Sequence, residues 1–172
     1  MQNKSSEMQI GNRKFQVADS TYIMGILNVT PDSFSDGGKY NRTDEALKQA
    51  ERMVGEGADI IDVGGESTRP GHQQISEEEE IQRTAQIIRL IKERFDIPVS
   101  IDTYKGKVAE AALQAGADMV NDIWGLKYDE KIAGVIADSG VTCCLMHNRD
   151  NTKYHSFMED VKADLRETLT IA

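Results

Sequence analysis

The sequence predicts an α/β fold in which strands alternate with single helices and form a parallel sheet. Short apolar runs alternate with amphipathic segments of helical period. A unit of helix, Gly-Ala-Asp and apolar run occurs at 50–65 and 109–125, with a weaker copy at 137–148. Polar side chains stand at the carboxyl ends of the apolar runs, at the edge where a barrel or a doubly wound sheet places its site: Asn28, Asp62, Asp102, Asn121, Asp122 and His147.

The first elements are a hairpin and a buried strand. Residues 8–17 alternate apolar and polar around Gly-Asn, which predicts a hairpin, with residues 1–20 forming a lid before the first core strand. The apolar run 22–29 predicts that strand, and Thr30-Pro31 ends it. The polar, glycine-containing segment 32–38 predicts a loop.

The next two helices carry end signals. Thr43 predicts a cap for a helix that Gly55 and Gly57 end. Strand 58–64 and a second glycine-rich loop, 65–71, follow. Ser76 and Glu79 form a capping box, so the four glutamates 77–80 are interpreted as structural. The predicted apolar stripe of this helix is Ile81, Ala85, Ile88, Leu90 and Ile91.

The remaining pattern predicts strand 97–102, helix 105–115, strand 116–122, strand 141–146 and a helix that starts near residue 160. Five strands are thus expected in 172 residues. A closed eight-stranded barrel usually takes about 250 residues. We therefore expect one domain over 1–172, incomplete at its carboxyl end and lacking about three βα units.

Composition favours small-molecule chemistry. The chain is 39% hydrophobic and its formal net charge is -9, which disfavours partners such as nucleic acid or a membrane surface. An apolar stretch of about 18 residues and a charged-then-apolar leader are both missing, so a cytoplasmic location is expected. The adjacent Cys143 and Cys144 are expected to be reduced core thiols.

The candidate chemistry is recognition by oxygen and amide groups. The hydrolase, Walker and zinc motifs are missing from the sequence. Asp102 and Asn121 follow neighbouring strands and could bind a flat heterocycle, since a carboxylate accepts two N–H donors and an amide offers a donor and an acceptor. Either could equally satisfy backbone groups within the sheet.

Other groups suit an anion and a metal. Asn28, Asp32 and Asp36 are hard oxygen ligands of the kind Mg²⁺ prefers. Thr68 and Arg69 could hold an anion, although Arg69 could also be a solvated surface residue.

Phe34 lies between polar neighbours in the first loop. It could stack on a planar substrate or anchor the loop against the barrel rim.

Four motifs resemble dihydropteroate synthase: N-V-T-P-D-S-F-S-D-G-G at 28–38, D-V-G-G-E-S-T-R-P-G at 62–71, S-I-D-T-Y-K at 100–105 and N-D-I-W-G at 121–125. The resemblance runs from about residue 8 to the end and covers the amino-terminal portion of that family. It implies a (β/α)8 TIM barrel, of which about five βα units are present. The implied reaction joins 6-hydroxymethyl-7,8-dihydropterin diphosphate to p-aminobenzoate in folate biosynthesis.

The resemblance also implies site roles. Positions matching Asp102 and Asn121 bind the pterin, and those of Ile123 and Met146 line its pocket. The position of Asn28 serves Mg²⁺ and the diphosphate.

Two loops complete the implied site. Thr68 and Arg69 match a loop near the diphosphate, whereas Phe34 and Asp36 match the loop that closes over p-aminobenzoate, where sulfonamides bind in this family. A catalytic nucleophile and a general base are not expected, because positioning and charge stabilisation carry the reaction.

The family's later pterin aspartate, Ser-Arg-Lys motif and terminal arginine-histidine pair lie beyond Ala172, so this chain alone is expected to be inactive. Homodimers are expected of the longer family members. A pterin-dependent methyltransferase and a non-catalytic pterin-binding or partner-binding relative are the alternatives, and the T-P-D-S-F-S-D-G-G loop argues against the first.

Overall fold

A computed structural model describes residues 7–30, 39–67 and 74–172. Its first two strands form an antiparallel hairpin, β1 (Glu7–Ile10) and β2 (Arg13–Gln16). Five parallel strands follow in chain order across one sheet: β3 (Met24–Asn28), β4 (Ile60–Gly64), β5 (Val99–Asp102), β6 (Met119–Asp122) and β7 (Thr142–Leu145). The helices are α1 (Lys39–Gly55), α2 (Glu77–Arg94), α3 (Gly106–Gln114), α4 (Ile132–Ser139) and α5 (Phe157–Ile171). The predicted parallel sheet of βα units is confirmed.

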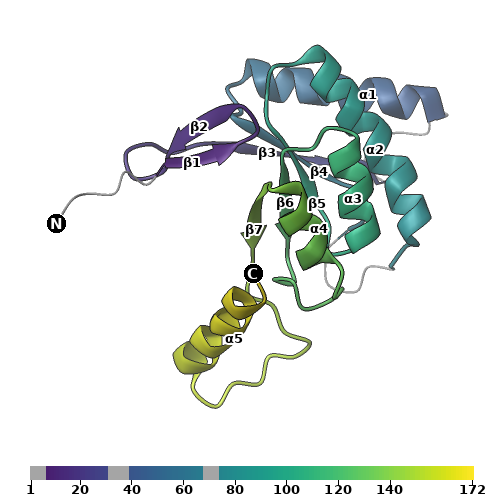
Figure 1. The fold of residues 1–172 in the computed structure, drawn as a ribbon. Coiled ribbons are helices and arrows are strands. Elements are labelled where there is room, and N and C mark those ends of the chain that lie inside the picture. The colour runs from purple at the N-terminus through teal and green to yellow at the C-terminus, as the bar shows by residue number, and fades with distance from the viewer. Residues whose placement is uncertain (1–6, 31–38, 68–73) are drawn as a thin grey trace.

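The sheet has one face covered by helices. Figure 1 shows α1 to α4 side by side along it, and each of these helices packs on the next. Strand alternation sends Ile61, Val63 and Ile101 into this helical layer, where they are fully buried. The intervening residues Asp62, Gly64 and Asp102 therefore face the opposite side, which is the interior in a closed barrel.

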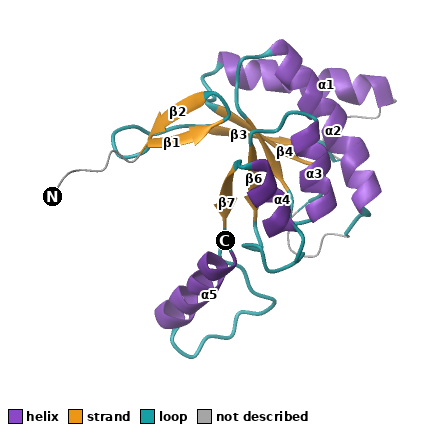
Figure 2. Cartoon of the chain, in the orientation of Figure 1, coloured by secondary structure: helices purple, strands orange, loops and turns teal. Residues whose placement is uncertain are grey.

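The hairpin covers the amino-terminal end of the sheet. It stands apart from the helical layer in Figure 2. Its Ile10 and Phe15 form a buried cluster with Ile60 and Met119, the first residues of β4 and β6. The predicted Gly-Asn turn is present, and Gly11 adopts φ +58, a left-handed conformation that glycine accepts without strain.

Two helices differ in detail from the prediction. α1 begins at Lys39, four residues before the expected cap at Thr43. No glycine or proline separates Lys39 from Thr43, so helical hydrogen bonding can extend back through this segment.

α2 has the predicted N-cap, since Ser76 Oγ accepts from Glu79 N at 3.2 Å. Its buried face, however, consists of Glu80, Thr84, Ile87, Ile88 and Ile91, rotated from the predicted stripe. The polar pair Glu80 and Thr84 is buried because Glu80 has a cationic partner inside the protein.

The cysteines are free, as expected, but the expectation that both lie in the core is wrong. Cys143 is half-buried and Cys144 is exposed. The cause is strand alternation, which turns Cys144 to the open face of the sheet. None of the helices within the described ranges is long and apolar enough to cross a membrane.

Candidate functional site

The candidate site is a row of residues across the carboxyl ends of four neighbouring strands: Asn28, Gly64, Asp102 and Asn121, called the row below. Strand register pairs Asn28 with Gly64, Gly64 with Asp102, Asp102 with Asn121, and Asn121 with Cys144. Residues paired in a parallel sheet point to the same face. Asn28, Asp102 and Asn121, which are far apart in the sequence, therefore share one face and one end of the sheet, as predicted.

Gly64 leaves room for the side chains beside it. A Cβ at this position would lie 3.2 Å from Asn28 Oδ1 and 3.6 Å from Asp102 Oδ2. Both oxygens therefore converge on the space above Gly64. A larger residue there would fill the place where these two groups can reach a common ligand.

Asp62 lies one layer deeper, in register with Ile26 and Ser100. It is 3% exposed, and its Oδ2 accepts a hydrogen bond from Asn121 Nδ2 at 3.1 Å. Burial raises the pKa of Asp62, an effect that the Asn121 amide partly offsets. Asp62 thus fixes the amide of Asn121, a role that the sequence analysis did not assign to it.

Asp102 has unusual electrostatics. Burial, together with the nearby carboxylates of Asp62, Glu80 and Asp122, raises the pKa of Asp102 to about 7. In the part of the chain that the structure describes, Asp102 Oδ1 is buried without a hydrogen-bond partner. A buried, unpaired carboxylate oxygen of raised pKa is a typical feature of a ligand site.

The predicted pocket residues Ile123 and Met146 follow neighbouring strands. Ile123 is half-buried and Met146 is 46% exposed. Met146 N donates to Asp122 O at 3.2 Å, which ties the end of β7 to the residue before Ile123. The two apolar side chains therefore belong to adjacent strand ends, beside Asn121.

Asp122 has a structural role. It is fully buried, and its carboxylate accepts from Trp124 N at 2.8 Å and from Leu126 N at 2.6 Å. These bonds hold a turn in which Gly125 (φ 59) and Leu126 (φ 67) adopt left-handed conformations. Asp122 therefore shapes the segment after Asn121 and does not take part in the row.

His147, also expected at a strand end, is engaged elsewhere. Its Nε2 lies 2.7 Å from Asp164 Oδ2, and the Arg149 guanidinium forms a bidentate pair with the same carboxylate. The hydrogen bonds from Arg149 hold the pKa of Asp164 at about 2. His147 and Arg149 thus fasten α5 to the loop after β7.

Four predicted site residues, Phe34, Asp36, Thr68 and Arg69, and also Asp32, lie outside the described residues.

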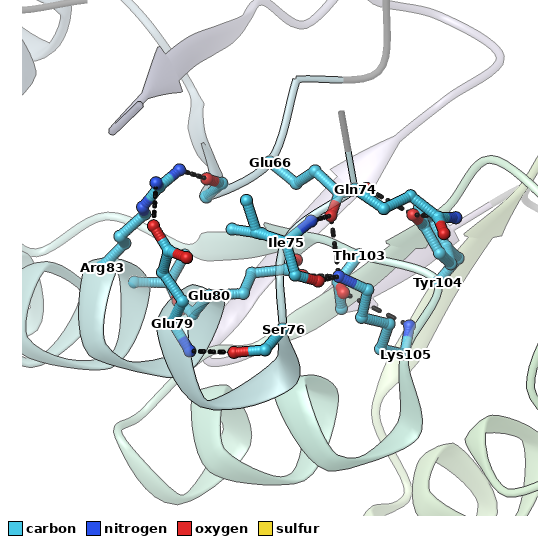
Figure 3. Close-up of polar contacts among 12 residues, drawn as sticks. Glu66, Gln74, Ile75, Ser76, Glu79, Glu80, Arg83, Thr103, Tyr104 and Lys105 are labelled. Carbon is cyan, nitrogen blue, oxygen red and sulfur yellow. Dashed lines mark hydrogen bonds and ion pairs between the residues drawn. The ribbon is translucent and has the colours of Figure 1, made fainter. Parts of the chain in front are cut away.

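The structure adds a group that sequence reasoning missed. Glu66, Glu80, Tyr104 and Lys105 form a buried polar cluster beside the row (Figure 3). Glu66 and Lys105 fall within the resemblance motifs, but nothing in the sequence pairs them.

Comparison with known proteins agrees with this geometry. A family model described as "Pterin binding enzyme" matches residues 24–172. The dihydropteroate synthase of Clostridium beijerinckii is 62% identical over 165 residues, 96% of this chain and 61% of that protein.

Solved structures show the same similarity. Clostridium difficile dihydropteroate synthase, determined in the presence of pteroic acid, superposes with a TM-score of 0.87 at 52% identity, covering 90% of this chain and 59% of that one. Xanthomonas albilineans dihydropteroate synthase with 4-aminobenzoic acid gives a TM-score of 0.86 at 37% identity, covering 95% and 60%.

The chain spans about three fifths of the length of these relatives. The predicted resemblance to dihydropteroate synthase and to part of its barrel is confirmed. Because the family model matches most of its length, from residue 24 to residue 172, this chain belongs to the pterin-binding enzyme family.

Proposed function

We propose that this chain carries the pterin-binding part of a dihydropteroate synthase, which joins 6-hydroxymethyl-7,8-dihydropterin diphosphate to p-aminobenzoate and releases diphosphate. The observation that carries the proposal is the row Asn28, Gly64, Asp102 and Asn121. It brings three polar side chains together at the carboxyl end of the open face of the sheet, called the mouth below. The relatives solved with pteroic acid and with 4-aminobenzoic acid support this choice of substrates.

Asp102 and Asn121 recognise the pterin ring in this proposal. An ionised Asp102 accepts N–H groups of the ring, and the amide of Asn121, fixed by Asp62, offers a carbonyl oxygen and its second N–H. Ile123 and Met146 supply apolar contacts to the flat faces of the ring. The unpaired Asp102 Oδ1 then gains its hydrogen-bond partner from the ligand.

The acidic surroundings of Asp102 suit the reaction. In the proposed step the bond between the methylene carbon and the diphosphate oxygen breaks, the electron pair leaves with the diphosphate, and the amine nitrogen of p-aminobenzoate bonds to the carbon. The amine then loses a proton to solvent. Positive charge develops on the pterin meanwhile, and the carboxylates that raise the pKa of Asp102 stabilise it.

Magnesium fits the site in a limited way. Asn28 Oδ1 is a hard oxygen directed to the space above Gly64. Within the described residues, no group of three histidine, cysteine or acidic side chains could hold a metal. Mg²⁺ commonly uses few protein ligands together with waters and substrate phosphate oxygens, so Asn28 can serve as one of few. When bound, the ion would neutralise charge on the departing diphosphate.

Thr68 and Arg69 are proposed to bind the diphosphate, and Phe34 and Asp36 to face p-aminobenzoate. We also propose that a protein of the relatives' full length that contains this chain is a cytoplasmic homodimer. Sedimentation of such a protein measures its mass directly, and a monomer at micromolar concentration would contradict the dimer.

Two measurements test the function. Calorimetric titration of this chain with 6-hydroxymethylpterin tests the ring site, and saturable one-to-one binding is expected. Diphosphate release is measured on this chain and on this chain joined to the remainder of the Clostridium beijerinckii relative. Release that requires both p-aminobenzoate and Mg²⁺ is expected only from the longer protein.

The outcomes separate the alternatives. Pterin binding without diphosphate release by the longer protein would indicate a non-catalytic pterin-binding relative. Methyl transfer from a methylated folate, again without diphosphate release, would indicate a methyltransferase. Absence of pterin binding by both chains would refute the ring site.

A further inference from the structure

Cys144 continues the row onto the fifth strand, although the proposed function gives it no role. Strand register pairs Asn121 with Cys144, as it pairs Asp102 with Asn121. Residues paired in a parallel sheet point to the same face, so the thiol of Cys144 and the amide of Asn121 are neighbours on the open face. The row of oxygen and amide groups therefore ends beside a thiol.

The preceding residue, Cys143, points the other way. It is half-buried and packs against the hydrophobic core beneath the helices, whereas Cys144 is exposed. Strand alternation accounts for the difference. Two adjacent residues of the same chemistry are thus presented to opposite faces of the sheet, which makes Cys143 a natural control for any role of Cys144.

A buried carboxylate with a free oxygen lies next to this thiol. Asp62 belongs to β4, and its Oδ2 reaches across β5 to accept from Asn121 Nδ2 on β6 at 3.1 Å. Asp62 is 3% exposed, and its Oδ1 finds no hydrogen-bond partner among the described residues. A buried acceptor that lacks a donor indicates a place where a ligand supplies one. This indication of a ligand is independent of the cysteine.

Electrostatics agrees that Cys144 and Asp62 are close. Burial and the charge of Asp62 raise the pKa of the Cys144 thiol. The thiol is therefore neutral at pH 7. A neutral cysteine side chain is small, polarisable and only weakly polar, so it packs well against a flat ring.

We propose that Cys144 belongs to the ring site, where its sulfur packs against the pterin held by Asp102 and Asn121 and its small size sets the room at that end of the row. The contact rests on the proposed function, which supplies the ring. Because the thiol is exposed until a ligand covers it, Cys144 is also a site of alkylation by a small neutral electrophile, and bound pterin blocks this reaction.

Iodoacetamide reports on the contact. The Cys144 thiolate sulfur attacks the methylene carbon of the reagent, the carbon–iodine bond breaks with its electron pair leaving on iodide, and the thiol proton goes to solvent. Alkylation is run at about pH 8.5, where thiolate is more abundant than at pH 7. Cys143 and Cys144 are the two cysteines of the chain, so Cys143→Ser leaves Cys144 alone and Cys144→Ser leaves Cys143 alone. Intact mass then follows each thiol separately.

Protection by ligand is the main readout. Saturating 6-hydroxymethylpterin should slow alkylation of Cys144 in Cys143→Ser by about tenfold or more, because a covered thiol cannot be attacked. Alkylation of Cys143 in Cys144→Ser should stay within about twofold. Adding Asp102→Asn to Cys143→Ser should raise the pterin concentration that gives half-protection by the same factor as the Kd measured by calorimetry, which ties protection to the ring site.

Side-chain size is the second readout. Cys144→Leu should weaken pterin binding by about tenfold, since the larger side chain takes space that the ring needs. Cys144→Ser keeps the size and should stay within about threefold of the parent, as should Cys143→Ser. Urea denaturation of each variant separates the readouts from stability, because a purely structural cysteine would change unfolding without any protection by pterin.

The outcomes are distinguishable. Pterin binding that leaves alkylation of Cys144 as fast as before refutes the contact and leaves the proposed function standing, and so does unchanged pterin affinity in Cys144→Leu. Equal protection of Cys143 and Cys144 would mean that the ligand tightens the whole chain, which also refutes the contact. A parent chain that binds no pterin in calorimetry contradicts the ring site itself, and the contact falls with it.

Discussion

The two ends of the five-stranded sheet use carboxylates in opposite ways. At the amino-terminal end, Asp59 Oδ2 accepts from Ile23 N at 2.7 Å, and Asp118 Oδ2 accepts from Val99 N at 2.9 Å and from Lys92 Nζ at 2.7 Å. Each of these aspartates thereby fastens its own strand to the one before it in the sheet. The carboxylates at this end stabilise the fold.

At the carboxyl-terminal end, Asp62 and Asp102 each keep one buried oxygen without a partner among the described residues. Burial raises the pKa of both. A protein rarely leaves such groups unsatisfied without a reason, and a ligand that supplies the missing donors is the common one. Under the proposed function, the contrast means that one end of these strands stabilises the fold and the other end recognises the ligand.

The largest expected effect is on the pH dependence of stability. Folding raises the pKa of Asp102 from 3.8 to about 7, so the folded state holds a proton that the unfolded state has released between these values. Stability of the parent should therefore fall as pH rises through this window, by about 2–4 kcal/mol in total. Asp102→Asn removes this titrating group. Urea denaturation from pH 4 to pH 8 should therefore show the unfolding free energy of the variant rising relative to that of the parent as pH rises. A constant difference would contradict the unfavourable environment of Asp102.

The same substitution should weaken ligand binding by a slightly smaller free energy. Asp102→Asn keeps the shape of the side chain but loses a charged acceptor worth about 1.5–3 kcal/mol, so 6-hydroxymethylpterin should bind about 10-fold to 100-fold more weakly at pH 8. Calorimetry measures this change. Asp138→Asn, on the exposed surface of α4, serves as the control. Equal affinity of Asp102→Asn and parent would remove Asp102 from the site.

A carboxylate at the opposite end should affect only stability. Asp118→Ala removes the acceptor of Val99 N and the carboxylate partner of Lys92, and should cost about 2 kcal/mol of unfolding free energy in urea. Asp138→Ala, at the weaker third copy of the repeat, should stay within about 0.5 kcal/mol. If Asp118→Ala loses pterin affinity under conditions in which the variant is fully folded, the amino-terminal and carboxyl-terminal ends of the sheet are not independent.

The smallest effect is expected from one methyl group in the mouth. Gly64→Ala places a Cβ 3.2 Å from Asn28 Oδ1, so the neighbouring side chains must shift by a few tenths of an ångström. Pterin affinity should fall about tenfold, which corresponds to about 1.4 kcal/mol. Gly134→Ala, whose added Cβ meets nothing within 4 Å, is the control. Tighter pterin binding by Gly64→Ala would mean that the mouth is wider than the row implies.

Sequence reasoning predicted the strands and the row because both follow from local periodicity. Apolar runs identify parallel strands, and polar residues at their ends meet at one edge whatever the helices do. The Gly-Ala-Asp repeat is visible in the sequence, but the role of its aspartate is not. Only the structure shows that Asp59 and Asp118 accept from the preceding strand in the sheet, whereas Asp138 lies exposed within α4.

The remaining contacts depend on pairings that no local pattern encodes. Lys105 and Glu80 are separated by a strand and most of a helix, and the glutamate run 77–80 has the composition of a solvated helix start. Glu80 is buried because Lys105 pairs with it, and this pairing can be seen only in the structure. Likewise, the sequence places His147 among the strand-end polar groups, and no local pattern links it to its partner Asp164, which lies 17 residues later on α5.

Strand register determines which side chains reach the carboxyl end of the sheet on its open face. This limits the insertions and deletions that the strands can accept. Inserting or deleting a single residue within β5 would turn Asp102 toward the helices and bring an apolar neighbour to the mouth, since side chains alternate along a strand. Insertions or deletions in the segments after the strands leave the positions of these side chains unchanged. Lineages of such proteins should therefore accumulate insertions in the connecting segments while the four or five residues of each strand keep their number.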